Sequence, residues 1–238
     1  MYEELKDKNF IIIAVAFDTG GIAAVKDWIR PPDPTALPKE LLDIMGWEES
    51  LSRKAATPTY PCLIDEKHIV AELYQMVNVP MAVWINEQGR IVRPAEAAGA
   101  SDGFRTMDRT TFQMAADVAA QGKQIRKTYV DAIRDWVANG DASAYALSSD
   151  VARQRVHMPT ENEALAMANF RLGQYLYQQG QQQDAQRYFA EAKRLQPESW
   201  CFKRQSLELE EVGKASGPEF WAAVDALGDK PYYPPVRF

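Results

Sequence analysis

Cysteine and histidine are scarce in this sequence, and the shortage narrows the chemistry that the chain can perform. The 238 residues include two cysteines, Cys62 and Cys201, and two histidines, His68 and His157. These residues are too widely spaced for a Cys-x-x-Cys redox motif or for the ligand spacing of a zinc site. The composition therefore predicts no metal and no cofactor, and we expect both cysteines to be small buried side chains.

Excess charge and long apolar runs are also missing. Lys and Arg number 27 against 33 Asp and Glu, a net charge of −6 with no long run of either sign, which disfavours nucleic-acid binding. The longest apolar stretch, around residues 10–17, is far shorter than the ~20 residues that span a bilayer. The acidic start MYEELKDKN lacks the basic and apolar segments of a signal peptide. We therefore expect no membrane or nucleic-acid partner and a cytoplasmic location.

Apolar residues are abundant, and their arrangement changes along the chain. Hydrophobic residues make up 46% of the sequence, enough for real cores in a chain of this length. Strand-like runs (FIIIAVAFD, PCLID and MAVWI) occur in the first half, and the third leads through the turn NEQG into a short returning strand. From Gly122 onward the pattern is helical. We therefore predict two domains, 1–121 and 122–238, with a Pro-rich, partly helical insertion at 31–59.

The first half resembles the thioredoxin-like superfamily, in particular the TlpA- and ResA-type thiol-disulfide oxidoreductases and the AhpC/TSA-like redoxins. The resemblance rests on FIIIAVAFD, TYPCLIDEKHIVAELY and NVPMAVWINEQGRIV, and it covers about residues 1–120. It implies an α/β thioredoxin-like domain, a cis peptide bond at Val79–Pro80, and a groove in which Val79 and Pro80 meet a protein thiol or disulfide substrate. An ordinary proline at the start of a strand is the other interpretation of Pro80.

The reactive part of such a domain is absent from the sequence. The family carries Cys-x-x-Cys at a helix start, where the helix dipole stabilises the thiolate, and residues 1–9 match only the last turns of that helix. The resemblance implies an incomplete domain whose first strand and motif lie upstream of Met1. Either the start codon is assigned too late, as a selenocysteine codon taken for a stop would cause, or the domain has lost its chemistry.

Such an incomplete domain has two consequences. An open sheet edge invites self-association, unless the insertion at 31–59 protects it. No other nucleophile is evident, because Cys62 enters a strand and lacks the helix start or the cation that a peroxidatic cysteine needs. We therefore expect the chain as given to be inactive and to have no catalytic residue of its own.

The second half resembles a single tetratricopeptide repeat. The matching positions are Leu172, Gly173, Gly180, Ala185, Phe189, Ala192 and Pro197. In such repeats small residues let two helices approach, and the proline ends the second helix. We predict helices over 124–139, 161–179, 182–195, 199–212 and 218–227. Repeats of this kind bind extended peptides, but about three are needed for a free-standing stack, so packing against the first domain is an equal alternative.

Two functions follow from these resemblances. The first is a thiol or selenol redoxin without its active-site motif, fused to an all-α repeat-like domain that binds partners or stabilises the fold. The second is a non-catalytic protein–protein interaction module built on a redox-inactive thioredoxin fold. The tail at Tyr232–Pro235 is either a polyproline II ligand or a segment that covers apolar surface of its own domain.

Overall fold

Two short pairs of strands lie in the first half of the chain. The computed structural model describes residues 1–29 and 58–238. In it, β1 (Ala14–Ala16) pairs in parallel with β2 (Cys62–Ile64), and β3 (Met81–Ile85) pairs antiparallel with β4 (Ile91–Ala97). These pairs form two separate two-stranded sheets.

The predicted thioredoxin-like α/β domain is wrong, because that fold requires one continuous sheet. The run at 10–18, expected as a central strand buried on both faces, is a strand only at Ala14–Ala16, and Ile11 and Ile13 are 60% and 56% exposed. Within the described residues β2 is the only strand that pairs with it. A strand whose neighbours are missing leaves backbone groups and side chains without partners, so the run stays mostly irregular. Residues 31–57 of the predicted insertion lie outside the described residues.

Helices make up most of the described chain. The α-helices are α1 (Tyr2–Leu5), α2 (Gly21–Ile29), α5 (Ile69–Leu73), α6 (Ala116–Asn139), α7 (Ser149–Arg155), α8 (Glu161–Gln178), α9 (Gln182–Leu195), α10 (Trp200–Glu210) and α11 (Pro218–Asp225). Short 3₁₀ turns are η1 (Asp102–Thr106), η2 (Gly140–Ala142) and η3 (Lys214–Ser216). All five helices predicted for the second half are present, although α6 begins earlier, at Ala116, so the predicted boundary at 121/122 lies inside it.

Local sequence signals explain where the later helices begin. Thr160 and Glu163 form a capping box at the start of α8, and the Ser199 hydroxyl accepts a hydrogen bond from the Phe202 N–H at the start of α10. These side chains satisfy N–H groups that have no partner within the helix. Pro218 occupies the first turn of α11, where its missing N–H has no cost.

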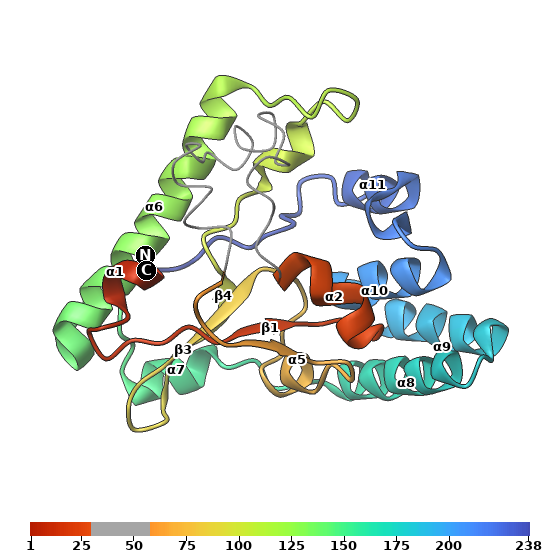
Figure 1. Ribbon diagram of the computed structural model, residues 1–238, viewed down its shortest axis with the longest axis horizontal. Coiled ribbons are helices and arrows are strands. Elements are labelled where there is room, and N and C mark those ends of the chain that lie inside the picture. Colours follow the sequence, from red (N-terminus) through yellow and green to blue (C-terminus); the bar gives the residue numbers. More distant parts are fainter. Residues whose placement is uncertain (30–57) are drawn as a thin grey trace.

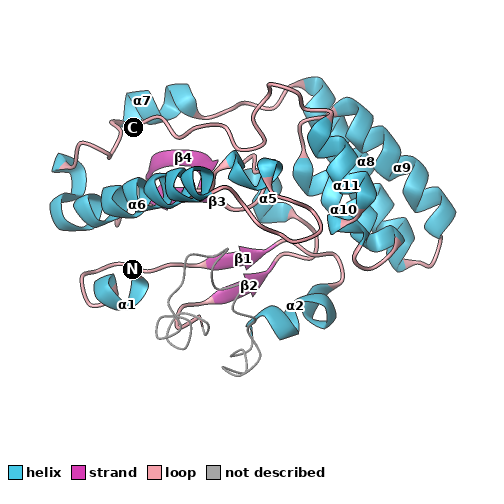
Figure 2. Ribbon diagram, turned by 90° about the horizontal axis from the view of Figure 1, so that it is seen from above, coloured by secondary structure: helices cyan, strands magenta, loops and turns pink. Residues whose placement is uncertain are grey.

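The cores sit at both ends of the molecule. Helices α8–α11 gather at one end and α6 lies at the other, with β3 and β4 beside α6 and with β1 and β2 nearer the middle (Figures 1 and 2). At the α6 end, the indole N–H of Trp84 in β3 donates to the Tyr129 hydroxyl of α6 at 2.8 Å. At the other end, Phe170 of α8 stacks on Phe202 of α10 with 4.5 Å between ring centroids.

Buried polar contacts join the helical end to the first half. The Gln174 side-chain amide of α8 donates to the Thr19 hydroxyl at 2.7 Å and to the Glu66 carbonyl at 3.2 Å. The Thr19 N–H donates in turn to the side-chain carbonyl of Gln205 in α10 at 3.3 Å. These contacts fix α8 and α10 against the loops that follow β1 and β2.

The C-terminal strap, residues 232–238, runs back from α11 across the first half (Figure 1). The Tyr232 and Tyr233 N–H groups donate to the Asp102 carboxylate at 2.8 and 2.7 Å, and the Arg93 guanidinium donates to the Arg237 carbonyl at 2.9 Å. Tyr232 is 3% exposed and packs among Trp200, Phe220 and Val224. The interpretation of the tail as a segment that covers its own apolar surface is confirmed.

Candidate functional site

The predicted substrate groove is contacted by the strap. The Val79–Pro80 peptide bond is cis, as predicted. The Tyr233 hydroxyl donates to the Val79 carbonyl at 2.8 Å, and the Asn78 side-chain carbonyl accepts from the Val79 N–H at 2.8 Å. An extended substrate that pairs with the backbone needs these same groups. They are engaged within the chain, and the role of Val79 and Pro80 in substrate binding stays a prediction.

The two cysteines lie in different elements and are both free. Cys62 is in β2 and Cys201 is in α10, and both are partly buried rather than fully buried as we expected. Burial raises the pKa of the Cys201 thiol to about 12, and its Sγ lies 3.5 Å from the Met76 carbonyl oxygen. Cys201 is therefore a protonated, unreactive thiol near neutral pH. Within residues 1–29 and 58–238, no three His, Cys, Asp or Glu side chains are placed to hold a metal ion.

His68 is buried where the two halves of the chain meet. Its side chain is 1% exposed and lies between the rings of Phe17 and Phe170, with centroid distances of 5.9 and 5.2 Å. Burial lowers the pKa of this imidazole, because the charged form loses its hydration. His157, by contrast, is exposed and contacts Glu163. His68 is thus a neutral core residue that joins the halves.

The α8–α9 hairpin is held together by small residues. A Cβ atom added at Gly173 would lie 2.6 Å from the Phe189 ring, so only glycine allows this approach. Ala185, Phe189 and Ala192 of α9 are fully buried against α8. Gly180 has a φ of +76°, which the turn between the helices requires. Four of the residues that carry the tetratricopeptide resemblance therefore form the interface between the two helices: Gly173, Ala185, Phe189 and Ala192.

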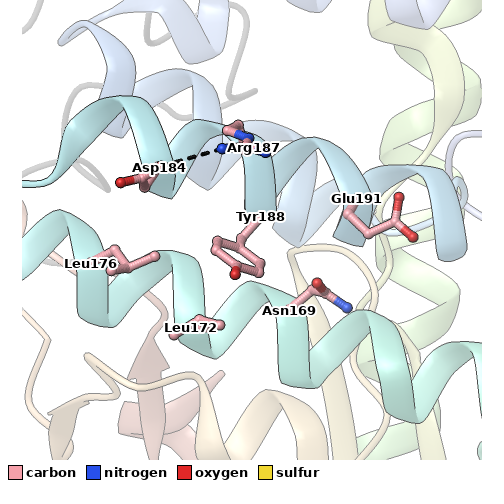
Figure 3. A pocket seen from close by; sticks show the side chains of 7 residues that line it. All are labelled: Asn169, Leu172, Leu176, Asp184, Arg187, Tyr188 and Glu191. Atoms are coloured by element: carbon pink, nitrogen blue, oxygen red, sulfur yellow. Dashed lines mark ion pairs between the residues drawn. The ribbon is translucent and has the colours of Figure 1, made fainter.

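One flank of this hairpin is hollowed, and we call the hollow the hairpin groove (Figure 3). It has a volume of about 500 Å³. It is lined by Asn169, Leu172, Leu176, Asp184, Arg187, Tyr188 and Glu191. Leu172 and Tyr188 remain 39% and 36% exposed, whereas α10 packs on the opposite flank through Phe202. Within the described residues, the groove is the flank of the hairpin that no third helix covers.

Charged side chains border the apolar part of the groove along α9. Asp184 pairs with Arg187 at 3.6 Å, and Glu191 pairs with Arg194 at 2.6 Å. The Arg194 guanidinium lowers the pKa of the exposed Glu191 carboxyl through this hydrogen bond. The four charges alternate in sign along one helix. Tyr188 and Leu172 are the exposed apolar side chains of the groove, and these charges lie beside them.

Of the groove residues, sequence reasoning named Leu172 alone, and only as a position of the tetratricopeptide resemblance. The signal that was available is the recurrence of Asp184, Arg187, Glu191 and Arg194 at three- and four-residue intervals, which puts them on one face of α9. The sequence could not show that this face borders a hollow, because that depends on how α9 packs against α8.

Comparisons with known proteins add no assignment. Neither the protein-family models nor the curated proteins nor the solved structures gave a significant match to the chain. Among the described residues, no helix combines the length and the apolar character that crossing a membrane requires. An arrangement of helices does not by itself define an activity, so the feature that bears on function is the hairpin groove.

Proposed function

We propose that this chain is a non-catalytic protein–protein interaction module that binds an α-helix in the hairpin groove. The observation that carries the proposal is the groove itself: Leu172 and Tyr188 are exposed side by side, bordered by fixed charges. Apolar anchors within a polar rim are the usual composition of a protein-binding surface. Tyrosine is also among the residues that contribute most to binding at such surfaces.

A rigid scaffold holds this surface in place. Phe170 and Phe189, directly behind the groove, are both fully buried, and their ring centroids are 5.4 Å apart. The hairpin therefore does not have to reorganise when a partner binds. A surface that is already in its bound shape loses less conformational entropy on binding.

The shape of the groove favours a helix over an extended peptide. It lies between two antiparallel helices, and α10 already occupies the equivalent position on the other flank. Side-chain ridges of one helix pack into such grooves at interaxial distances of about 8–10 Å. A strand would instead need free backbone N–H and C=O groups, which the interior of a helix does not offer. The redoxin hypothesis has no comparable support, because Cys201 is unreactive and Cys62 is in a separate strand.

Selection from a display library of amphipathic helical peptides tests the proposal. We expect selected peptides to share apolar residues at i, i+3, i+4 and i+7. Their affinity should fall at least about tenfold for Leu172→Asp, because the substitution puts a charge at the apolar anchor. The matched control is Leu73→Asp, a 72% exposed leucine on α5 outside the groove, which should bind as wild type. Circular dichroism confirms that both variants are folded.

Two results would contradict the proposal. One is a library that yields no enriched peptide after repeated rounds. The other is a set of peptides that bind Leu172→Asp as tightly as the wild-type chain, since their site would then lie elsewhere.

A further inference from the structure

The charges along α9 form a self-complementary pattern. Asp184, Arg187, Glu191 and Arg194 alternate negative, positive, negative, positive. Their side chains are 55%, 80%, 39% and 67% exposed, in that order. All four are therefore available to a molecule that lies along this helix.

The pattern is symmetric about Phe189 with a change of sign. Asp184 and Arg194 lie five residues before and after Phe189. Arg187 and Glu191 lie two residues before and after it. When a second α9 runs antiparallel across a two-fold axis at this position, each charge meets its opposite. A parallel arrangement would instead set every charge against an identical one.

From this symmetry we propose that the helix bound in the hairpin groove is α9 of a second copy of this chain. The inference rests on the proposed function, because it names the partner of the same groove. Each α9 lies along the groove of the other copy. Asp184 then faces Arg194 of the second copy, and Arg187 faces Glu191 of the second copy. An interface of this kind uses the same patch on both subunits and closes as a dimer.

The apolar groove residues fit the same geometry. Tyr188 is one residue from the axis, so the two tyrosines meet near the centre of the interface. Leu172 of α8, which lines the groove together with Tyr188, borders them. A central tyrosine pair within a ring of charges resembles the core and rim of known interfaces. In this proposal the chain self-associates through its helical end. From the sequence we had instead expected self-association through an open sheet edge.

Charge substitutions test the register directly. In Arg187→Glu, two glutamates face each other at both symmetric positions, and in Glu191→Arg two arginines do. Sedimentation velocity should show each single variant as a monomer at concentrations where the wild-type chain is dimeric, with at least about a tenfold weaker dimerisation constant. The double variant Arg187→Glu/Glu191→Arg restores opposite charges at every position and should dimerise again.

Mixing the two single variants gives the sharpest result. Arg187→Glu carries negative charges at both positions and Glu191→Arg carries positive ones, so a mixture should form heterodimers although neither variant dimerises alone. Arg153→Glu, at an 81% exposed arginine on α7, is the matched control and should leave the dimer unchanged. Raising the salt to about 0.5 M should weaken the wild-type dimer, because it screens the exposed pairs.

Specific outcomes would overturn the inference. They are a wild-type chain that stays monomeric up to about 1 mM, single variants that dimerise as wild type does, and a mixture that stays monomeric. The library selection on the wild-type chain separates the two proposals. If the wild-type chain is monomeric but selected helices still bind and lose affinity with Leu172→Asp, the groove binds other proteins and only the self-pairing is wrong. If no helix binds either, both proposals fail.

Discussion

The helical end of this molecule and its first pair of strands contain similar apolar residues and bury them to different degrees. At the helical end Ala166, Phe170 and Phe189 are fully buried. At the first pair of strands, Ile13 next to β1 and Leu63 within β2 are 56% and 53% exposed. A helix satisfies its own backbone and needs only one apolar face covered. A strand depends on neighbouring segments for its backbone hydrogen bonds. The comparison teaches that apolar content builds a core only where the backbone groups also have partners.

Among the tests of this comparison, removal of a ring from the core should have the largest effect on stability. We expect Phe170→Ala to lower the free energy of unfolding by about 3–5 kcal/mol, because the fully buried ring contacts Phe189, Phe202 and His68. Ile13→Ala, at the exposed strand-like run, should change it by less than about 0.5 kcal/mol. Urea unfolding followed by circular dichroism measures both. Equal losses would show that the strand-like run is packed as tightly as the helical end.

A second test uses His68, which joins the two halves of the chain. Burial lowers its pKa, while nearby Asp65 and Asp18 and the Gln205 amide oppose that shift in part. Unfolded histidine takes up a proton near pH 6.5 and folded His68 does so only at lower pH, so unfolding binds a proton in between. The stability is therefore fully present above about pH 6.5 and falls as the pH drops toward the folded pKa. The slope for one proton is at most about 1.4 kcal/mol per pH unit.

Substitution separates this effect from other titrations. His68→Asn tolerates the positive φ of 55° at this position. It should reduce the loss of stability between roughly pH 6.5 and pH 5, whereas His157→Asn, at the exposed histidine, should retain it. Urea midpoints measured across this range are the readout. An unchanged acid slope in His68→Asn would mean that His68 is not what couples proton uptake to unfolding.

The smallest expected effect is at the start of the hairpin. The Thr160 hydroxyl accepts a hydrogen bond from the Glu163 N–H at 3.3 Å, and the Glu163 carboxylate accepts one from the Thr160 N–H at 2.6 Å. Thr160→Ala removes half of this capping box and should cost about 1 kcal/mol in thermal or urea unfolding. Thr160→Ser keeps the hydroxyl and should cost much less. Equal effects of the two substitutions would assign the loss to packing.

The sequence predicted the helical end well because its signals are local. Gly180 marks the turn between α8 and α9, Pro197 follows the end of α9, and Ser199 begins α10. Each signal acts within a few residues of its own position. The cis bond at Val79–Pro80 was also predicted, although from the family resemblance rather than from the dipeptide.

The first half was mispredicted because a strand depends on distant partners. FIIIAVAFD has the composition of a buried strand, but composition cannot supply the neighbouring strands that would bury it. For the same reason, the sequence did not predict that Arg93 is buried. This arginine is fully buried, binds the Glu96 carboxylate at 2.7 Å, and lies 5.0 Å from the Phe238 ring centroid. Its other partners, Arg237 and Phe238, lie on the strap, and nothing near Arg93 in the sequence indicates them. The hairpin groove was not predicted either, because it depends on how α9 packs against α8.

The strap also decides how the molecule would respond to mechanical force. Residues 232–238 attach α11 to Asn78, Asp102 and Arg93 by hydrogen bonds across the chain. Tension applied at Phe238 would load these bonds and the Arg93–Phe238 contact first, before it reaches α8–α10. The helical end is shielded from such tension until the strap peels away. An optical trap should therefore record a short, low-force extension before the main unfolding event.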